Sequence, residues 1–458
     1  MSNVTLAKFG GTPLGTAYGF QRARGIAASK RDIRIVVASA PGKANGVNRA
    51  VRPDPVKVTN VLYSVLKHEL PAEEGIIKIQ RRFEEIEDGL QIRPENRVSP
   101  LVHNEIMQRL NLKDDSIPAL GEYLNTRLFV NYLNQTGIPA RFVQPSDICF
   151  RVNEQGGKYV VDSSRYDIIG GRLRELLAED GRVLVVPGFY GNDATGAVRT
   201  FPRGGSDYTG AVLAAGIGAK YLNYTDTDGI RVVEDEISET APRIPWMTHR
   251  ELSELTQGGK FGIFQYEAVG PLEERRVETR VLNAFSEDSQ GTLVASAPEG
   301  NSRSPVAGIV HRGQLTSFKI RVPGRANQVG LVNEITSLFS EIGEERGISI
   351  EHIFTSTDDI SAIVKNEQIE NSKVPVPEVA ERIRRRTGSR NVESHGMNII
   401  AVVGEKMGIR TISDVFSTLA DCGIGTPEFN HTGISLTLGI ENGAAMRAAG
   451  ALYQRFFG

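Results

Sequence analysis

Short apolar runs that end in glycine or proline turns recur through the first two thirds of this chain. Residues 33–38 (IRIVVA) and 183–186 (VLVV) are the clearest, and residues 4–9 form a third run that leads into Gly10-Gly11. Helical stretches such as residues 122–136 separate these runs. Apolar strands that alternate with helices are typical of a sheet with helices on both faces. The sequence therefore predicts an α/β fold in which ligands bind at the carboxyl ends of the strands.

The last third of the chain has another pattern, β-α-β-β-α, which occurs about twice. The predicted elements are strands over 316–322, 348–354, 360–364, 398–403 and 433–440, and helices over 328–341 and 411–419, with a last helix that ends at Phe457. Each copy has the size of a small domain, roughly 60–80 residues. The loop-like composition of residues 295–305 (ASAPEGNSRSP) marks the predicted boundary.

Composition narrows the class of protein. A chain of 458 residues predicts two to four domains. Its formal net charge of −2 gives no reason to expect nucleic acid or a membrane surface as a partner. Two cysteines cannot form a disulfide framework, and no apolar run approaches the ~18 residues of a membrane helix. We therefore expect a globular cytoplasmic protein.

Three clusters carry residues suited to phosphate and carboxylate chemistry. Lys8-Phe9-Gly10-Gly11-Thr12 combines an ammonium group with approachable backbone N–H groups, and it is not the eight-residue P-loop pattern. Residues 203–207 (RGGSD) precede a helix of small residues, and residues 225–229 (TDTDG) follow a predicted strand. Taken singly, the three clusters are equally compatible with a glycine turn beside a surface lysine, a helix N-cap and an Asp-Gly turn.

In this order the three clusters resemble the aspartate kinase family, within the amino acid kinase fold. The segments SAPGK (39–43), KVTN (57–60), Gly121-Glu122 and PGFYG (187–191) also stand in family order, and the resemblance covers essentially the whole chain. It implies a carbamate-kinase-like open sheet between helices, in a catalytic domain over residues 1–297. Residues 298–458 would form two ferredoxin-like α+β ACT modules. The first module would span about 316–390, and the second would combine about 298–315 with 396–458.

The implied activity is transfer of the γ-phosphoryl group of ATP to the side-chain carboxylate of L-aspartate. That carboxylate is already ionised, so the site needs positioned charge rather than a general base. By resemblance, Lys8 and Asp207 would be catalytic. Aspartate would contact Ser39, Thr59, Glu122, Arg203 and Ser206, and the nucleotide would contact Lys8, Gly10, Gly11, Thr12, Thr225 and Asp226. No metal held by the protein is expected, since Mg²⁺ would bridge the phosphates of ATP.

The segments STDDIS (356–361) and GEKMG (404–408) resemble most the monofunctional, lysine-sensitive type. Feedback inhibition by an amino acid, with lysine the first candidate, is therefore expected at the first ACT module. Gly324 and Gly330 would leave backbone N–H groups for a carboxylate, and Glu351 would hold an ammonium group, although an exposed strand residue is the simpler interpretation of Glu351. We expect a homodimer or a homotetramer joined through these modules.

The chain departs from the family pattern at several positions. Its own residues there are Pro13, Arg231, Glu234-Asp235-Glu236, Phe261-Gly262-Ile263 and Phe429-Asn430-His431-Thr432. The aspartate-facing set is therefore better preserved than the nucleotide-facing set. Two alternatives stay open at this point: a kinase for another amino-acid carboxylate in specialised metabolism, and a non-catalytic amino-acid sensor with ACT modules.

Overall fold

The computed structural model describes residues 4–43, 57–112, 116–202, 204–257, 264–296, 304–325, 330–342, 348–405, 407–426 and 428–458. The chain divides into two compact units. Unit 1 comprises Met1–Ile230, Arg243–Leu252 and Gly262–Glu299, and unit 2 comprises Arg231–Pro242, Ser253–Phe261 and Gly300–Gly458. Two segments that precede residue 298 thus belong to unit 2. Within the described ranges, no helix is both long enough and apolar enough to cross a membrane.

Unit 1 is built on an eight-stranded sheet with the order β10-β12-β11-β9-β1-β2-β6-β3. All neighbouring strands are parallel except β11 and β12, so the sheet is mixed. The strands are β1 (Thr5–Phe9), β2 (Ile33–Ala38), β3 (Ala140–Phe142), β6 (Val183–Pro187), β9 (Lys220–Thr225), β10 (Trp246–Met247), β11 (Thr279–Asn283) and β12 (Thr292–Val294). The predicted α/β fold is confirmed, and the three apolar runs are its central strands.

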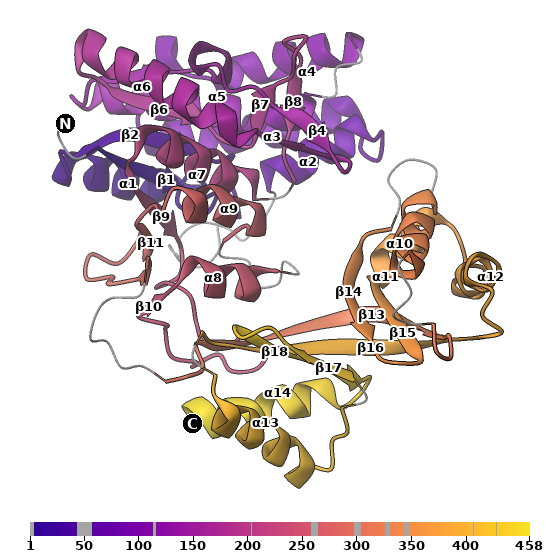
Figure 1. Cartoon of the computed structure of the whole chain (residues 1–458). Coiled ribbons are helices and arrows are strands. Elements are labelled where there is room, and N and C mark those ends of the chain that lie inside the picture. Colours follow the sequence, from indigo (N-terminus) through magenta and orange to yellow (C-terminus); the bar gives the residue numbers. More distant parts are fainter. Residues whose placement is uncertain are drawn as a thin grey trace. The chain divides into compact units, whose positions relative to one another are not determined.

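Helices cover both faces of this sheet (Figure 1). They are α1 (Ala17–Ser29), α2 (Val58–Leu66), α3 (Ala72–Gly89), α4 (Val102–Asn111), α5 (Leu120–Gln135), α6 (Tyr166–Asp180), α7 (Gly205–Ile217) and α9 (Val269–Glu274). Helix α8 (His249–Thr256) begins in unit 1 and ends in unit 2. Two hairpins, β4 (Asn153–Gln155) with β5 (Lys158–Val160) and β7 (Tyr190–Asn192) with β8 (Val198–Thr200), were not predicted. Their strands are too short to give a periodic signal.

The alternation of side chains along β1 determines the face of the sheet to which Lys8, in the first sequence cluster, points. Ala7 and Phe9 enter the core formed with α1, α2, α3 and α5, where the Phe9 ring meets Phe129 edge-on at 6.1 Å. Because successive side chains of a strand point to opposite faces, Lys8 points to the other face, where α7 packs on β1. Register then puts Lys8 opposite Asn223 of β9.

Unit 2 has a six-stranded antiparallel sheet with the order β14-β15-β13-β16-β18-β17. The strands are β13 (Gly308–Arg321), β14 (Ile350–Thr355), β15 (Asp359–Lys365), β16 (Asn391–Val403), β17 (Glu428–His431) and β18 (Ser435–Glu441). The helices are α10 (Leu331–Glu341), α11 (Asn366–Ser372), α12 (Val376–Thr387), α13 (Ile409–Asp421) and α14 (Ala445–Phe457). The strands β14-β15-β13 on one side of the sheet correspond to β17-β18-β16 on the other side. This symmetry confirms the doubled β-α-β-β-α pattern.

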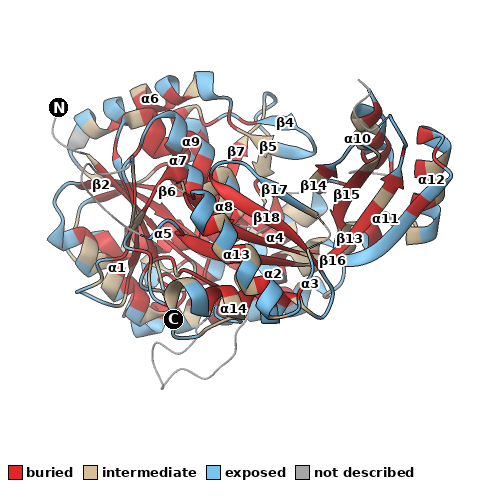
Figure 2. Cartoon of the chain, turned by 60° about the horizontal axis from the view of Figure 1, so that its bottom comes forward, coloured by how far each residue is buried: buried red, intermediate tan, exposed pale blue. Residues whose placement is uncertain are grey.

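Both halves of unit 2 share the two long central strands. β13 and β16 pair from Gly308↔Val403 to Arg321↔Asn391, with one irregularity between Arg312 and Leu315. The sequence predicted shorter strands here because polar residues such as Gln314 and Glu393 interrupt the apolar runs. Burial is concentrated in the sheets and on the inner faces of the helices, as Figure 2 shows.

Helices α6 and α7 approach each other through glycines. A Cβ atom at Gly170 would lie 1.9 Å from the Gly216 oxygen, so no larger residue fits there. We expect Gly170→Ala to lower the free energy of unfolding by about 3 kcal/mol, the upper end for overpacking. Gly171→Ala is the control, because a Cβ atom there meets nothing within 4 Å and alanine favours a helix by about 1 kcal/mol. Denaturant titrations of both variants measure this, and equal stability would contradict the close approach.

Candidate active site

A buried ion pair joins the first two sequence clusters. Lys8 Nζ lies 2.6 Å from Asp207 Oδ1, and the two residues are 7% and 6% exposed. Asn223 Nδ2 donates to the same carboxylate oxygen at 3.0 Å. Strands β1 and β9 supply the ammonium and the amide, and the first turn of α7 supplies the carboxylate. The ammonium group is therefore fixed near the carboxyl end of β1.

Glycines let α7 begin against this end of the sheet. Its N-cap residue Gly204 has φ 84°, a conformation that side chains other than glycine rarely adopt. A Cβ atom on Gly188 would lie 2.6 Å from Ser206, which shows how closely the turn after β6 approaches α7. The dipole of a helix favours an anion at its start, although the N–H groups of Gly205 and Asp207 already donate to Pro202 O and Gly204 O. Ser206 and Asp207 thus stand where a helix start and the strand ends meet.

The glycine turn after β1 lies beside the lysine. Gly10 Cα carries no side chain, and a Cβ atom there would lie 3.5 Å from Lys8 Nζ. The Gly10 N–H already donates to Tyr224 O at 3.0 Å, which places the following residue of β9, Thr225, next to the turn. Gly11 and Thr12, rather than Gly10, are therefore the candidate backbone donors. A Cβ atom on Gly11 would lie 3.0 Å from Ala40 O, so this approach also requires glycine.

A second group of polar side chains surrounds the ends of β2 and α5. Ser39 is 8% exposed, and its carbonyl accepts a hydrogen bond from Asn125 Nδ2 at 2.7 Å. The same amide donates to Leu14 O at 3.1 Å, so Asn125 ties two loops to α5. Thr59 stands in the first turn of α2 and is partly exposed.

Glu122, at the start of α5, is the most perturbed carboxyl group of this site. It is 4% exposed, and within the described part of the chain its Oε2 has no hydrogen-bond partner. Burial raises the pKa of Glu122 to about 8. A backbone hydrogen bond from Ala40 and the charges of Lys57 and Lys8 lower the pKa, but they offset only part of this rise. A buried acid with a raised pKa and an unpaired oxygen is a candidate functional residue.

The other predicted residues are less closely associated. Thr225 ends β9, and its hydroxyl donates to the exposed Asp226 at 3.1 Å. Arg203 and Gly262 lie outside the described residues. The predicted effector residues Gly324, Gly330 and Glu351 belong to unit 2, whereas Lys8 and Asp207 belong to unit 1.

Two of the effector residues already have partners. The Gly324 N–H donates to Asp358 Oδ1 at 2.9 Å, whereas Gly330, with φ 104°, is the N-cap of α10. Glu351 Oε1 lies 3.1 Å from Lys365 Nζ, and the Glu351 side chain is 13% exposed. Glu351 is therefore a largely buried, paired carboxylate rather than an exposed strand residue.

The sequence analysis missed Asn223 and Asn125. Both had a signal: Asn223 is a polar residue in the middle of the strand KYLNYT, and Asn125 follows Glu122 by one helical turn on the same face. Neither residue lies in a glycine-rich cluster, so the sequence alone does not mark it as part of the site. Its role becomes clear only when its hydrogen-bond partner is known.

Comparisons with known proteins identify the family of this chain. A model of the amino acid kinase family matches residues 3–283. Aspartokinase 3 of Bacillus subtilis is 28% identical over 479 aligned residues, which cover 99% of this chain and 99% of that protein. The predicted resemblance to aspartate kinases is thereby confirmed.

Two solved structures have the same fold over the whole length. E. coli aspartokinase III in complex with aspartate and ADP, in its R-state, superposes with a TM-score of 0.79 at 20% identity, covering 99% of this chain and 100% of that one. Its T-state, in complex with lysine and aspartate, gives 0.70 at 21% identity, with both chains fully covered. With its family match, its fold and its Lys8–Asp207 site, the chain belongs to the amino acid kinase family.

Proposed function

We propose that this chain is an aspartate kinase, which transfers the γ-phosphoryl group of ATP to the side-chain carboxylate of L-aspartate. The product is 4-phospho-L-aspartate, and in this family the reaction opens the route to lysine, threonine and methionine. The observation that carries the proposal is the buried Lys8–Asp207–Asn223 group beside the glycine turn, in a chain that matches B. subtilis Aspartokinase 3 along its full length. The bound aspartate and ADP of the E. coli enzyme support the same chemistry.

The residues of the cluster suit phosphoryl transfer to a carboxylate. The acceptor is already an anion, so the main obstacle is repulsion between it and the phosphate oxygens. Lys8 would offset this charge, while Asp207 and Asn223 hold its ammonium group in place at no cost of reorganisation during the reaction. Backbone N–H groups of Gly11 and Thr12, and the hydroxyl of Thr225 beside Asp226, would receive the nucleotide.

ATP fits the donors of this site, and Mg²⁺ would arrive with it. Mg²⁺ commonly keeps most of its ligands from water and phosphate. Its contribution would be to neutralise phosphate charge.

Aspartate would occupy the side of the site that contains Glu122. The buried carboxylate would accept the α-ammonium group, with Ser39, Thr59 and Ser206 as neutral partners. Arg203 would hold the α-carboxylate, since a guanidinium group binds a carboxylate with two parallel hydrogen bonds. With both cysteines unpaired, we also propose that the enzyme works in the reducing cytoplasm.

Unit 2 would carry the feedback control. We assign the catalytic domain to residues 1–297, the first ACT module to about 316–390, and the second to about 298–315 with 396–458. Lysine is the proposed effector, bound near Gly324, Gly330 and Glu351, and the lysine-bound T-state of the E. coli enzyme supports it. Free lysine would compete with Lys365 for the Glu351 carboxylate. A homodimer or homotetramer would join through the edges of this sheet.

Removal of the buried charge pair tests the reaction itself. Lys8→Met and Asp207→Asn should each lower kcat by about 10²–10³. Lys8→Met removes the positive charge beside the phosphoryl group, and Asp207→Asn removes the carboxylate that holds the ammonium group in place. The double variant should be little worse than either single variant, since the two residues act as one unit. Coupled assays of ADP release measure this, with Lys220→Met, at the exposed start of β9, as the control. Additive losses, or near-normal turnover in Lys8→Met, would refute the assignment.

The raised pKa of Glu122 predicts proton release when aspartate binds. At pH 7 a group with a pKa of about 8 is mostly protonated, and pairing with an ammonium group requires the charged form. Calorimetry in two buffers of different ionisation enthalpy should therefore show close to one proton released per aspartate. The affinity for aspartate should rise between pH 6 and pH 8.

Glu122→Gln should abolish this proton release, whereas Glu74→Gln, on the surface of α3, should retain it. Without aspartate, the same pKa shift makes the folded chain less stable as the pH rises from 4.5 towards 8, because the unfolded state has already lost the proton that the folded state keeps. If proton release persists in Glu122→Gln, another group accepts the ammonium.

Competition at Glu351 gives a test of the effector with two opposite outcomes. Glu351→Gln should weaken lysine binding more than tenfold, because the ammonium loses a largely buried carboxylate. Lys365→Met frees that carboxylate and should strengthen lysine binding. Calorimetry on the full chain measures both, and Glu367→Gln, an exposed carboxylate of α11, serves as the control. Unchanged affinity in both variants would place the effector elsewhere.

A further inference from the structure

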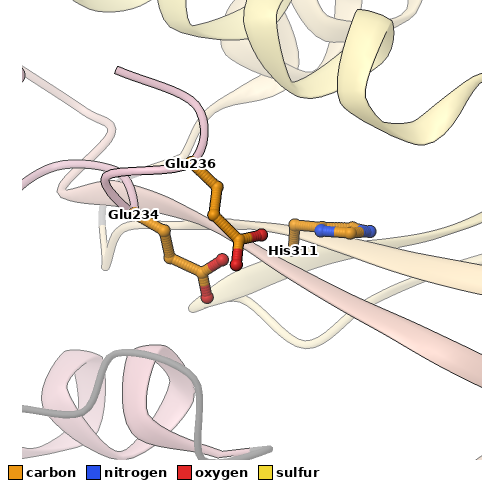
Figure 3. A group of neighbouring side chains, drawn as sticks. All are labelled: Glu234, Glu236 and His311. Carbon is orange, nitrogen blue, oxygen red and sulfur yellow. The ribbon is translucent and has the colours of Figure 1, made fainter. Parts of the chain in front are cut away.

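Three potential metal ligands converge in unit 2, and none of them is among the residues assigned to the kinase site. Glu234 and Glu236 come from the segment Arg231–Pro242, and His311 comes from β13. One ligand atom from each residue lies within 4.8 Å of the other two. Figure 3 shows both carboxylates and the imidazole ring facing one another. Sequence analysis did not connect them, since His311 is distant in the chain.

The imidazole ring of His311 is held in the orientation that a metal ligand needs. Its Nε2 lies 2.9 Å from Asn398 Oδ1, and Asn398 Nδ2 donates to Asn442 Oδ1 at 2.7 Å. This chain of amides makes Nε2 the protonated nitrogen, so Nδ1 carries the free lone pair. His311 is only 6% exposed, and its buried Nδ1 has no hydrogen-bond partner among the described residues. An orphaned acceptor at this depth is costly unless something binds it.

A glycine makes room for this hydrogen bond. A Cβ atom on Gly313 would lie 2.9 Å from Asn398 Oδ1 and 3.1 Å from His311 Cε1. Metal-bound histidines commonly donate their second N–H to an oxygen, which fixes the tautomer and raises the basicity of the ring. Asn398 takes that position here.

The segment that carries the two carboxylates is fastened to the same strand. Ile309 N–H of β13 donates to Val232 O at 2.7 Å, and Val232 N–H donates to Pro242 O at 3.0 Å. A turn follows, in which the N–H groups of Ile237 and Ser238 donate to Glu234 O. Glu234 is thereby held as a buried residue, whereas Glu236 is exposed and free to adjust.

We propose that Glu234, Glu236 and His311 bind a divalent transition-metal ion of the Zn²⁺ class. Two carboxylates and one neutral imidazole suit Zn²⁺, and water would fill the open position. Ligand atoms around a tetrahedral Zn²⁺ ion lie about 3.4 Å apart, for bonds of about 2.1 Å. The three ligand atoms lie within 4.8 Å of one another, so side-chain movement, for which the exposed Glu236 has room, would have to close the remaining distance. Mg²⁺ prefers oxygen ligands alone and would compete poorly.

The ion would fasten the segment Arg231–Pro242 to β13 within unit 2. It also gives a role to Glu234-Asp235-Glu236, which stands where the aspartate kinase family has Asp-Pro-Arg. In the proposed site, the two outer acids would bind the ion. Asp235 pairs instead with Arg231, at 2.9 Å.

Titration of the tag-free full chain with Zn²⁺, in excess Mg²⁺, tests the site. We expect one Zn²⁺ per chain that is lost or at least tenfold weaker in Glu236→Gln and in His311→Gln. Asp235→Asn is the matched control, because that carboxylate lies between the two ligands in sequence but outside the cluster, and its affinity should be unchanged. Co²⁺ gives a second readout, since its visible absorption bands should appear in the wild type and in Asp235→Asn only.

Glu236→Gln decides the question even if His311→Gln does not fold, since Glu236 is exposed and its replacement leaves the packing intact. Absence of Zn²⁺ binding at micromolar concentration would overturn the proposal. Equal binding by the wild type and Glu236→Gln would overturn it as well, because the ion would then be held elsewhere on the chain.

Discussion

The ion pair between Lys8 and Asp207 is the constraint on which the arrangement of unit 1 depends. Two opposite charges that are each more than nine-tenths buried are tolerated only if geometry is exact and the remaining donors are satisfied. Strand β1 must therefore present Lys8 to the face of α7, and β9 must place Asn223 at the same level. The glycines around Gly188 and Gly204 allow α7 to start close enough to complete the contact.

The second carboxyl group of the site is held in the opposite electrostatic condition. Asp207 faces a cation and an amide, whereas Glu122 is buried with one oxygen unpartnered in the described part of the chain. Asp207 on α7 and Glu122 on α5 thus differ in their environment. In the proposed reaction, Asp207 would organise the phosphate side, and Glu122 would receive an ammonium group.

The sequence predicted those features of the fold that depend on local sequence pattern. The run IRIVVA is strand β2 to the residue, since five of its six residues are apolar and four of these are β-branched, and the glycine clusters marked the strand ends around Lys8. The sequence did not predict features that depend on residues distant in the chain. The polar residues near Gln314 and Glu393 hid the true length of β13 and β16, because only pairing between the two strands compensates for them. Asn223 and the pair of Glu351 with Lys365 likewise needed the register of neighbouring strands.

The shared strands of unit 2 have a consequence for how such a protein can change over time. Each half contributes one end of β13 and one end of β16, so any cut between the halves severs both strands. Neither half can be excised, duplicated or transplanted as a separate cassette, although each has its own helices and hairpin. Inheritance and engineering must treat the two as one indivisible block, and a new ligand preference can arise in either half only by substitution in place.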